Sequence, residues 1–130
     1  ATSLADFSGA KVTAQLNTFH YSVIDQIPGV DKQTAMDNFP AMRVALQAGT
    51  IDAYVSELPE ALSAQAANSD FVMVKLTDGF KTSPEDTQTA VGVKKDSPLT
   101  KEINEALKTI SSEERQQIMQ DAIKNQPAAE

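Results

Sequence analysis

The sequence predicts an α/β fold: an open, mainly parallel, doubly wound sheet followed by C-terminal helices. Short apolar runs bounded by turn residues, typical of buried strands, alternate with segments whose apolar residues recur at helical spacing. Strands and helices that alternate in this way form parallel sheets with right-handed crossovers, and the helices cover the faces of the sheet. The chain has 130 residues, of which 41% are hydrophobic and 22% charged, so its composition is that of one globular core.

Four segments in the first half of the chain predict strands. Residues 11–16 (KVTAQL) alternate apolar and polar side chains, whereas residues 51–56 (IDAYVS) and 71–76 (FVMVKL) are short, β-branched and bounded by turns. Residues 30–36 give a weaker strand signal. If the strand order is 2-1-3, the first strand in the chain (residues 11–16) and the third (residues 51–56) are neighbours in the sheet.

Three segments between these strands predict helices: residues 19–27, 40–48 and 59–67. Pro40 and Pro59 suit the first turn of a helix, because the N–H group that proline lacks would be unpaired there anyway. Gly49 suits the left-handed conformation that often ends a helix. The order of elements is therefore β-α-β-α-β-α-β.

The character of the sequence changes after residue 76. Residues 77–88 are polar and contain Gly79 and Pro84, which predicts a loop and a domain boundary. We expect residues 1–88 to form one domain and residues 89–130 to follow it, beginning with a fifth strand over residues 89–95.

Two amphipathic helices are expected near the end of the chain. Ser97 and Pro98 precede the first helix, and Ser111 with Glu114 fits the capping box of the second. The apolar faces of both helices need a surface to cover. Residues 126–130 are expected to be a frayed end.

Charge and composition exclude several classes of function. The net charge of -7 would repel a nucleic-acid backbone, so we expect no nucleic-acid partner. Without cysteine there is no disulfide, thiolate zinc site or cysteine nucleophile, and His20 is the only histidine. No acidic residue accompanies His20 at metal-ligand spacing, so no metal is expected. No apolar run approaches the ~20 residues of a membrane span.

The carboxyl ends of the first and third strands predict a ligand site. Ligands of open parallel sheets bind beyond these ends, where the strand order reverses. Asn17, Thr18, Phe19 and His20 form the turn after the first strand, where N–H groups and the helix dipole attract an anion. Glu57 follows the third strand and would attract a cation. The two preferences together match the carboxylate and the ammonium of an α-amino acid.

Each of these residues also has an ordinary structural interpretation. Thr18 suits a helix N-cap, and Glu57 suits the first turn of a helix, where an acid complements the dipole. Phe19 suits packing, and His20 suits the surface or a cap. Asn17 suits a left-handed turn between a strand and a helix.

Several stretches of the chain, taken in order, resemble the C-terminal half of a family 3 extracellular solute-binding protein, the amino-acid receptor of an ABC importer with a type II periplasmic binding fold. The stretches are residues 4–12 (LADFSGAKV), 15–18 (QLNT), 45–59 (ALQAGTIDAYVSELP), 89–99 (TAVGVKKDSPL) and 103–107 (INEAL). They are similar to the family patterns L-x-D-L-x-G-K-x-V, Q-x-G-T, A-L-x-x-G-x-x-D-A-x-x-x-D-x-P, x-G-I-A-V-x-K-x-x-x-x-L and I-N-x-A-L. Asn17 replaces the usual Gly, and Glu57 stands where Asp is common.

The resemblance implies a ligand site made by four residues. It implies that Thr18 binds the α-carboxylate of an amino acid through its N–H and hydroxyl groups, and that Glu57 pairs with the α-ammonium. Asn17 and Phe19 would line the same loop. The implied protein is not an enzyme, and it needs no catalytic residue, cofactor or metal.

The resemblance also implies what surrounds the chain. Residues 1–88 correspond to lobe two, and residues 89–130 to the return strand and the helices that normally join lobe one, which this sequence lacks. The missing N-terminal lobe would supply an Arg clamp and much of the side-chain pocket. Without it, the terminal helices would pack elsewhere, stay mobile or pair between chains. The implied partners are an amino acid and a membrane permease, and the implied location is outside the cytoplasm, with a lipid anchor on the full-length protein.

Two other functions stay open on the same fold. A cyclohexadienyl dehydratase-like enzyme would use Glu57 as an acid or base on a prephenate-like substrate. An extracellular sensor domain of a membrane kinase would share the fold and bind a ligand at the same rim.

Overall fold

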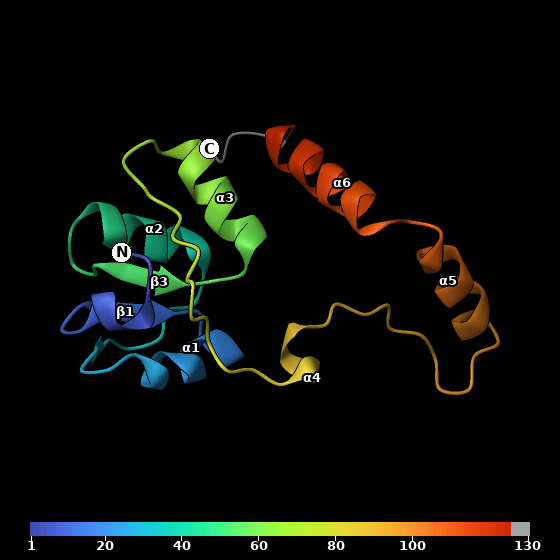
Figure 1. The fold of residues 1–130 in the computed structure, drawn as a ribbon, viewed down its shortest axis with the longest axis horizontal. Helices are drawn as coiled ribbons and strands as arrows, with labels where there is room; N and C mark the ends of the chain where they lie inside the picture. Colours follow the sequence, from blue (N-terminus) through green and yellow to red (C-terminus); the bar gives the residue numbers. More distant parts are fainter. Residues whose placement is uncertain (126–130) are drawn as a thin grey trace. The chain divides into compact units, whose positions relative to one another are not determined.

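The computed structural model describes residues 1–125, and these residues include two compact units. The first unit is Ala1–Thr87, and the second begins at Gln88. Figure 1 shows their helices and strands. The expected frayed end at residues 126–130 lies outside the described residues.

A three-stranded parallel sheet forms the centre of the first unit. Its strands are β1 (Lys11–Ala14), β2 (Asp31–Lys32) and β3 (Ala53–Val55), in the order β2-β1-β3. Val12 of β1 pairs with Lys32 of β2 and with Ala53 of β3, and Ala14 pairs with Val55. The predicted fold class is confirmed: the sheet is open and parallel, and its order is the 2-1-3 order on which the ligand-site argument depends.

Short helices connect the strands and cover the sheet. They are η1 (Leu4–Phe7), α1 (Phe19–Val23), η2 (Ile24–Gln26), α2 (Phe39–Gln47) and α3 (Leu58–Ala67). In Figure 1, α1 lies on one side of the strands, and α2 and α3 lie on the other. This is the arrangement that right-handed crossovers produce when the chain reverses direction across the sheet. The segment expected as one helix over residues 19–27 is a turn of α-helix followed by a 3-10 turn.

Local sequence explains where α2 begins and ends. The side-chain oxygen of Asn38 accepts a hydrogen bond from the Ala41 N–H group at 2.9 Å, and Pro40 lies in the first turn. Gly49 follows the helix with a φ of 69°, in the left-handed region that glycine adopts without a steric penalty. The predicted roles of Pro40 and Gly49 are therefore confirmed.

The core lies between β1 and the helices. Its central cluster is Val12 and Ala14 of β1 with Ile24 and Ile27, against which Phe7, Tyr21 and Phe80 pack among other side chains. Thr13 is also fully buried, and its hydroxyl donates to the carbonyl oxygen of Thr34 at 2.8 Å, so this buried polar side chain is paired. The buried middle strand fixes the position of the chain where β1 ends.

The prediction of a strand at residues 71–76 is wrong. A strand needs a partner strand for its N–H groups, but here the Met73 N–H donates to the side chain of Gln65 at 2.7 Å and the Phe71 N–H to the carbonyl of Asn68. None of residues 71–76 is buried, and Val72 is 79% exposed, so the segment has no face in the core. The apolar run resembles a strand in composition only.

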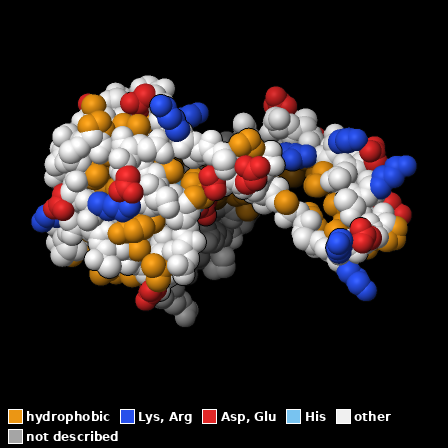
Figure 2. Space-filling view, turned by 90° about the horizontal axis from the view of Figure 1, so that it is seen from below, with side chains coloured by type: hydrophobic (Ala, Val, Ile, Leu, Met, Phe, Trp, Pro, Cys, Tyr) orange, Lys and Arg blue, Asp and Glu red, His pale blue; other side chains and the backbone are white. Residues whose placement is uncertain are grey.

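The second unit begins after the short helix α4 (Pro84–Thr87) and contains α5 (Leu99–Lys108) and α6 (Ser112–Lys124). Both predicted helices are confirmed, and the capping box of Ser111 and Glu114 is present. The fifth strand predicted at residues 89–95 is wrong, because no described strand pairs with this segment and its apolar side chains are exposed. On the right of Figure 2, hydrophobic side chains of the second unit lie among basic and acidic ones.

Candidate ligand-binding rim

The carboxyl ends of β1 and β3 bring the predicted site residues to one edge of the sheet. Ala14 pairs with Val55 in parallel, so the chain leaves both strands at the same edge. We call this edge the rim: Asn17, Thr18, Phe19 and His20 after β1, and Glu57 after β3. A contact between His20 and Glu57 shows that the two segments meet there.

The backbone of Asn17 turns the chain away from β1. Its φ is 62°, in the left-handed region that Asn adopts at a smaller penalty than most residues. This confirms the expected left-handed conformation of Asn17. The next residue, Thr18, returns to an extended conformation at the N-cap of α1.

The Thr18 hydroxyl donates to the carbonyl oxygen of Gln15 at 2.7 Å and makes no capping bond to α1. This hydrogen bond stabilises the turn between β1 and α1. Within residues 1–125, the backbone N–H groups of Thr18, Phe19 and His20 donate to no protein acceptor. Because α1 has five residues, its dipole is small, and the N–H groups themselves are what an anion would meet.

Glu57 lies at the N-cap of α3, but its side chain caps no N–H group of that helix. The carboxylate is 52% exposed, and its Oε2 lies 3.5 Å from Nε2 of His20. This differs from the structural interpretation of Glu57 as an acid that serves its own helix. The side chain instead faces across the rim toward α1, and part of it remains open to solvent.

His20 is a rim residue whose burial the sequence did not indicate. It was expected at the surface or as a cap, but its side chain is only 14% exposed and lies against Glu57. The ring of Phe19 lies on it with centroids 4.1 Å apart and a tilt of 33°. Burial lowers the pKa of His20 from 6.5, and the charge of Glu57 opposes this effect in part. The lowered pKa favours the neutral form of the imidazole.

A second polar cluster holds the start of α3 in place. Arg43 of α2 makes two hydrogen bonds to the carboxylate of Glu60 through Nη2, at 2.8 and 2.9 Å, and a third through Nε at 3.0 Å. The Tyr54 hydroxyl of β3 donates to the same carboxylate at 3.3 Å. Burial works to lower the pKa of Arg43, but hydrogen bonding and charge attraction from Glu60 raise it overall. The cluster thus links α2, β3 and α3 through Glu60, which lies three residues after Glu57 in the chain.

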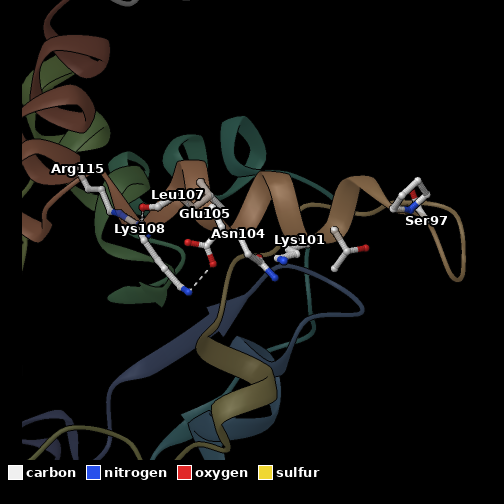
Figure 3. Close-up of a pocket in the computed structure, with 9 residues that line it drawn as sticks. Ser97, Lys101, Asn104, Glu105, Leu107, Lys108 and Arg115 are labelled. Atoms are coloured by element: carbon white, nitrogen blue, oxygen red, sulfur yellow. Dashed lines mark hydrogen bonds and ion pairs between the residues drawn. The ribbon is translucent and has the colours of Figure 1, made fainter.

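Other surfaces of the described residues offer less chemistry. Residues 1–125 contain no group of three His, Asp or Glu side chains that could hold a metal ion. A shallow depression in the second unit lies along α5 and the beginning of α6 (Figure 3). Two of its three cations are engaged: Lys108 pairs with Glu105 at 2.8 Å, and Arg115 donates to the carbonyl oxygens of Ile110 and Leu107. None of the helices among residues 1–125 is long and apolar enough to cross a membrane.

Comparison of the chain with protein-family models, with curated protein sequences and with solved structures finds no match. The molecule is a small α/β domain with a three-stranded parallel sheet, followed by a helical unit.

Proposed function

We propose that this chain is part of the amino-acid substrate-binding component of an ABC importer, in which it forms lobe two and the return to lobe one. The observation that carries the proposal is the composition of the rim. A half-exposed carboxylate, Glu57, lies across from a turn with unpaired N–H groups at Thr18, Phe19 and His20. Opposite charge preferences are thus held side by side at the edge where parallel sheets bind ligands.

An α-amino acid would use both halves of the rim. Its ammonium group is a donor that matches the half-exposed carboxylate of Glu57, and its carboxylate is an acceptor that matches the N–H groups after Asn17. The hydroxyl of Thr18 already donates its proton to the Gln15 carbonyl, so Thr18 would bind the carboxylate through its N–H group, and the hydroxyl would contribute through the shape that it gives the turn. Phe19 would stiffen the site through its contact with His20.

The proposed role is capture and delivery without covalent chemistry. An amino acid would bind between this lobe and a first lobe, and the closed protein would present it to a membrane permease outside the cytoplasm. These partners, and the lipid anchor of the full protein, come from the resemblance of residues 4–12, 15–18 and 45–59 to the solute-binding family. One lobe makes only half of the contacts, so binding to this chain alone is expected to be weak.

The dehydratase-like alternative gains one argument from the contact between His20 and Glu57, because such a pair can exchange a proton with a substrate. The two functions make different predictions for Glu57→Gln. A binding protein loses affinity, whereas an enzyme loses product formation from a prephenate-like acid while it still binds that acid.

Nuclear magnetic resonance of the ¹⁵N-labelled chain tests the proposal. Each standard amino acid is added in turn at millimolar concentration, and the amide signals of Thr18, Phe19 and His20 are followed. We expect at least one amino acid to move these signals in a saturable way. If every amino acid leaves the rim signals in place, the proposed function is wrong.

Two matched variants show whether the effect belongs to the rim. Glu57→Gln removes the carboxylate charge and keeps the side-chain shape, so it should weaken the response. Asp31→Asn makes the same charge change at the start of β2, at the opposite edge of the sheet, and should leave the response as it is. Equal weakening in both variants would point to net charge instead of a site.

A further inference from the structure

Among residues 1–125, the contact between His20 and Glu57 is the one in which a titratable group faces the carboxylate of the rim. Nε2 of His20 lies 3.5 Å from Oε2 of Glu57, within ion-pair distance when the imidazole is protonated. The two side chains differ in freedom. His20 is 14% exposed and has the Phe19 ring against it, whereas Glu57 is 52% exposed and reaches solvent. Glu57 can therefore meet a ligand while His20 stays where it is.

Other charged groups on the neighbouring elements are engaged or distant. Within α1, the Tyr21 hydroxyl donates to the carbonyl oxygen of Gln33. Asp25 of the adjoining η2 pairs with Lys32 at 2.9 Å. Lys11 of β1 lies at the other end of that strand, where β1 begins.

Glu57, from the segment between β3 and α3, is accordingly the charged group that acts on the imidazole. Removing or neutralising this single carboxylate should therefore change how His20 titrates.

We propose that the protonated His20 imidazole competes with the ammonium group of a ligand for the Glu57 carboxylate, so that a cationic group binds at this rim with release of the His20 proton to solvent. This inference rests on the proposed function, because it assigns a proton linkage to the same site. The competition needs no movement of the backbone, because the protonated His20 imidazole and the ammonium group of the ligand would both bind the same Glu57 carboxylate.

The direction of the linkage follows from the charges. The negative charge of Glu57 favours protonated His20, in opposition to burial, which favours the neutral ring. A bound ammonium group offsets the Glu57 charge, so it lowers the pKa of His20 further. By reciprocity, affinity for the ligand falls as the pH drops through the His20 pKa. The fall is limited to about tenfold for each pKa unit by which the ligand shifts His20.

The experiment uses the fact that the chain has a single histidine, so that its ring signals need no assignment by mutation. The ¹H and ¹³C ring signals of His20 are followed from about pH 8 to about pH 5, the range in which imidazoles titrate. The titration is repeated with each standard amino acid and with L-lactate, which has a hydroxyl in place of the ammonium group of L-alanine. We expect each amino acid that moves the rim amides to lower the His20 pKa, and lactate, which lacks the ammonium group, not to lower it.

Variants separate the electrostatic effect from a structural one. Glu57→Gln should lower the pKa of His20 in the free protein and abolish the further effect of an amino acid. Asp31→Asn should leave both unchanged. His20→Gln removes the titrating ring, so whatever its affinity near pH 8, the variant should lose the decline toward pH 5. A merely structural role of His20 would change affinity equally at both pH values.

The possible failures are distinguishable. If no amino acid moves the rim amides, the proposed function fails and the linkage fails with it. If amino acids move the amides but leave the His20 titration unchanged, or raise its pKa, the linkage alone is overturned and the binding function stands.

Discussion

Replacing Glu60 with Gln tests how the segment that carries Glu57 is held against the sheet. The Glu60 carboxylate is 12% exposed and accepts hydrogen bonds from the Arg43 guanidinium, which is 24% exposed, and from the Tyr54 hydroxyl. The glutamine side chain has the same length but carries no charge, and it has an amide NH₂ in place of one oxygen. One bond from Arg43 therefore becomes a contact between two donors.

The size of the effect follows from these contacts. A hydrogen bond to a charged group contributes about 1.5–3 kcal/mol, and loss of one partner of a buried ion pair costs about 3–5 kcal/mol. The pair is partly exposed, and glutamine keeps one acceptor, so we expect the free energy of unfolding to fall by about 2–3 kcal/mol. For a unit of this size, the loss corresponds to a decrease in melting temperature of roughly 10–20 °C.

Tyrosine fluorescence during urea unfolding measures this change. The chain has no Trp, and Tyr21 and Tyr54 both lie in the Ala1–Thr87 unit, so the signal reports on that unit. The control is Asp25→Asn, which makes the same kind of change in an ion pair whose carboxylate is 70% exposed and which should cost less than about 1 kcal/mol. If Glu60→Gln costs no more than Asp25→Asn, the cluster does not hold α3 in the way described.

Two further predictions concern a turn and a titration. Gly29→Ala should destabilise the first unit more than Gly9→Ala in urea unfolding. Both glycines have a positive φ, which costs a non-glycine residue about 1–2 kcal/mol. A Cβ at Gly29 would in addition lie 2.9 Å from the Ser8 hydroxyl oxygen, whereas a Cβ at Gly9 would meet no atom within 4 Å. Equal losses would contradict the close approach. Because the pKa of His20 is lower in the folded protein than the ordinary 6.5, the unfolded chain binds a proton more readily, so the free energy of unfolding should decline as the pH falls from about 7.5 through the folded pKa. The decline should be absent in His20→Gln, and a decline of equal size there would assign it to other groups.

The sequence correctly predicted the strands that pair with a neighbour in the sheet. Residues 11–16 and 51–56 alternate or are β-branched, and β1 and β3 lie within them. Residues 71–76 have the same apolar character, but composition does not tell whether a partner strand is present. Their N–H groups instead meet the side chain of Gln65 and the backbone of Asn68. Pairing is a property of the whole fold, so it was not available from a local pattern.

The meeting of two segments at the rim was predictable, but the contact between side chains was not. Once β1 and β3 are parallel neighbours, Glu57 must lie at the same edge as the turn that contains Thr18. The direction of the His20 side chain depends on a helix of one turn and on the left-handed residue Asn17 before it. The sequence indicated only that His20 lies in the same turn as the predicted ligand residues Asn17, Thr18 and Phe19.

The most direct measurement of the central claim changes the ligand and the protein together. The amino acid that moves the rim amides is compared with its analogue that has a hydroxyl in place of the α-ammonium, in the wild-type chain and in Glu57→Gln. The account predicts that loss of the ammonium costs the wild type on the order of 1 kcal/mol more than the variant, a modest value because Glu57 is half exposed. An equal cost in both proteins would contradict recognition of the ammonium by Glu57.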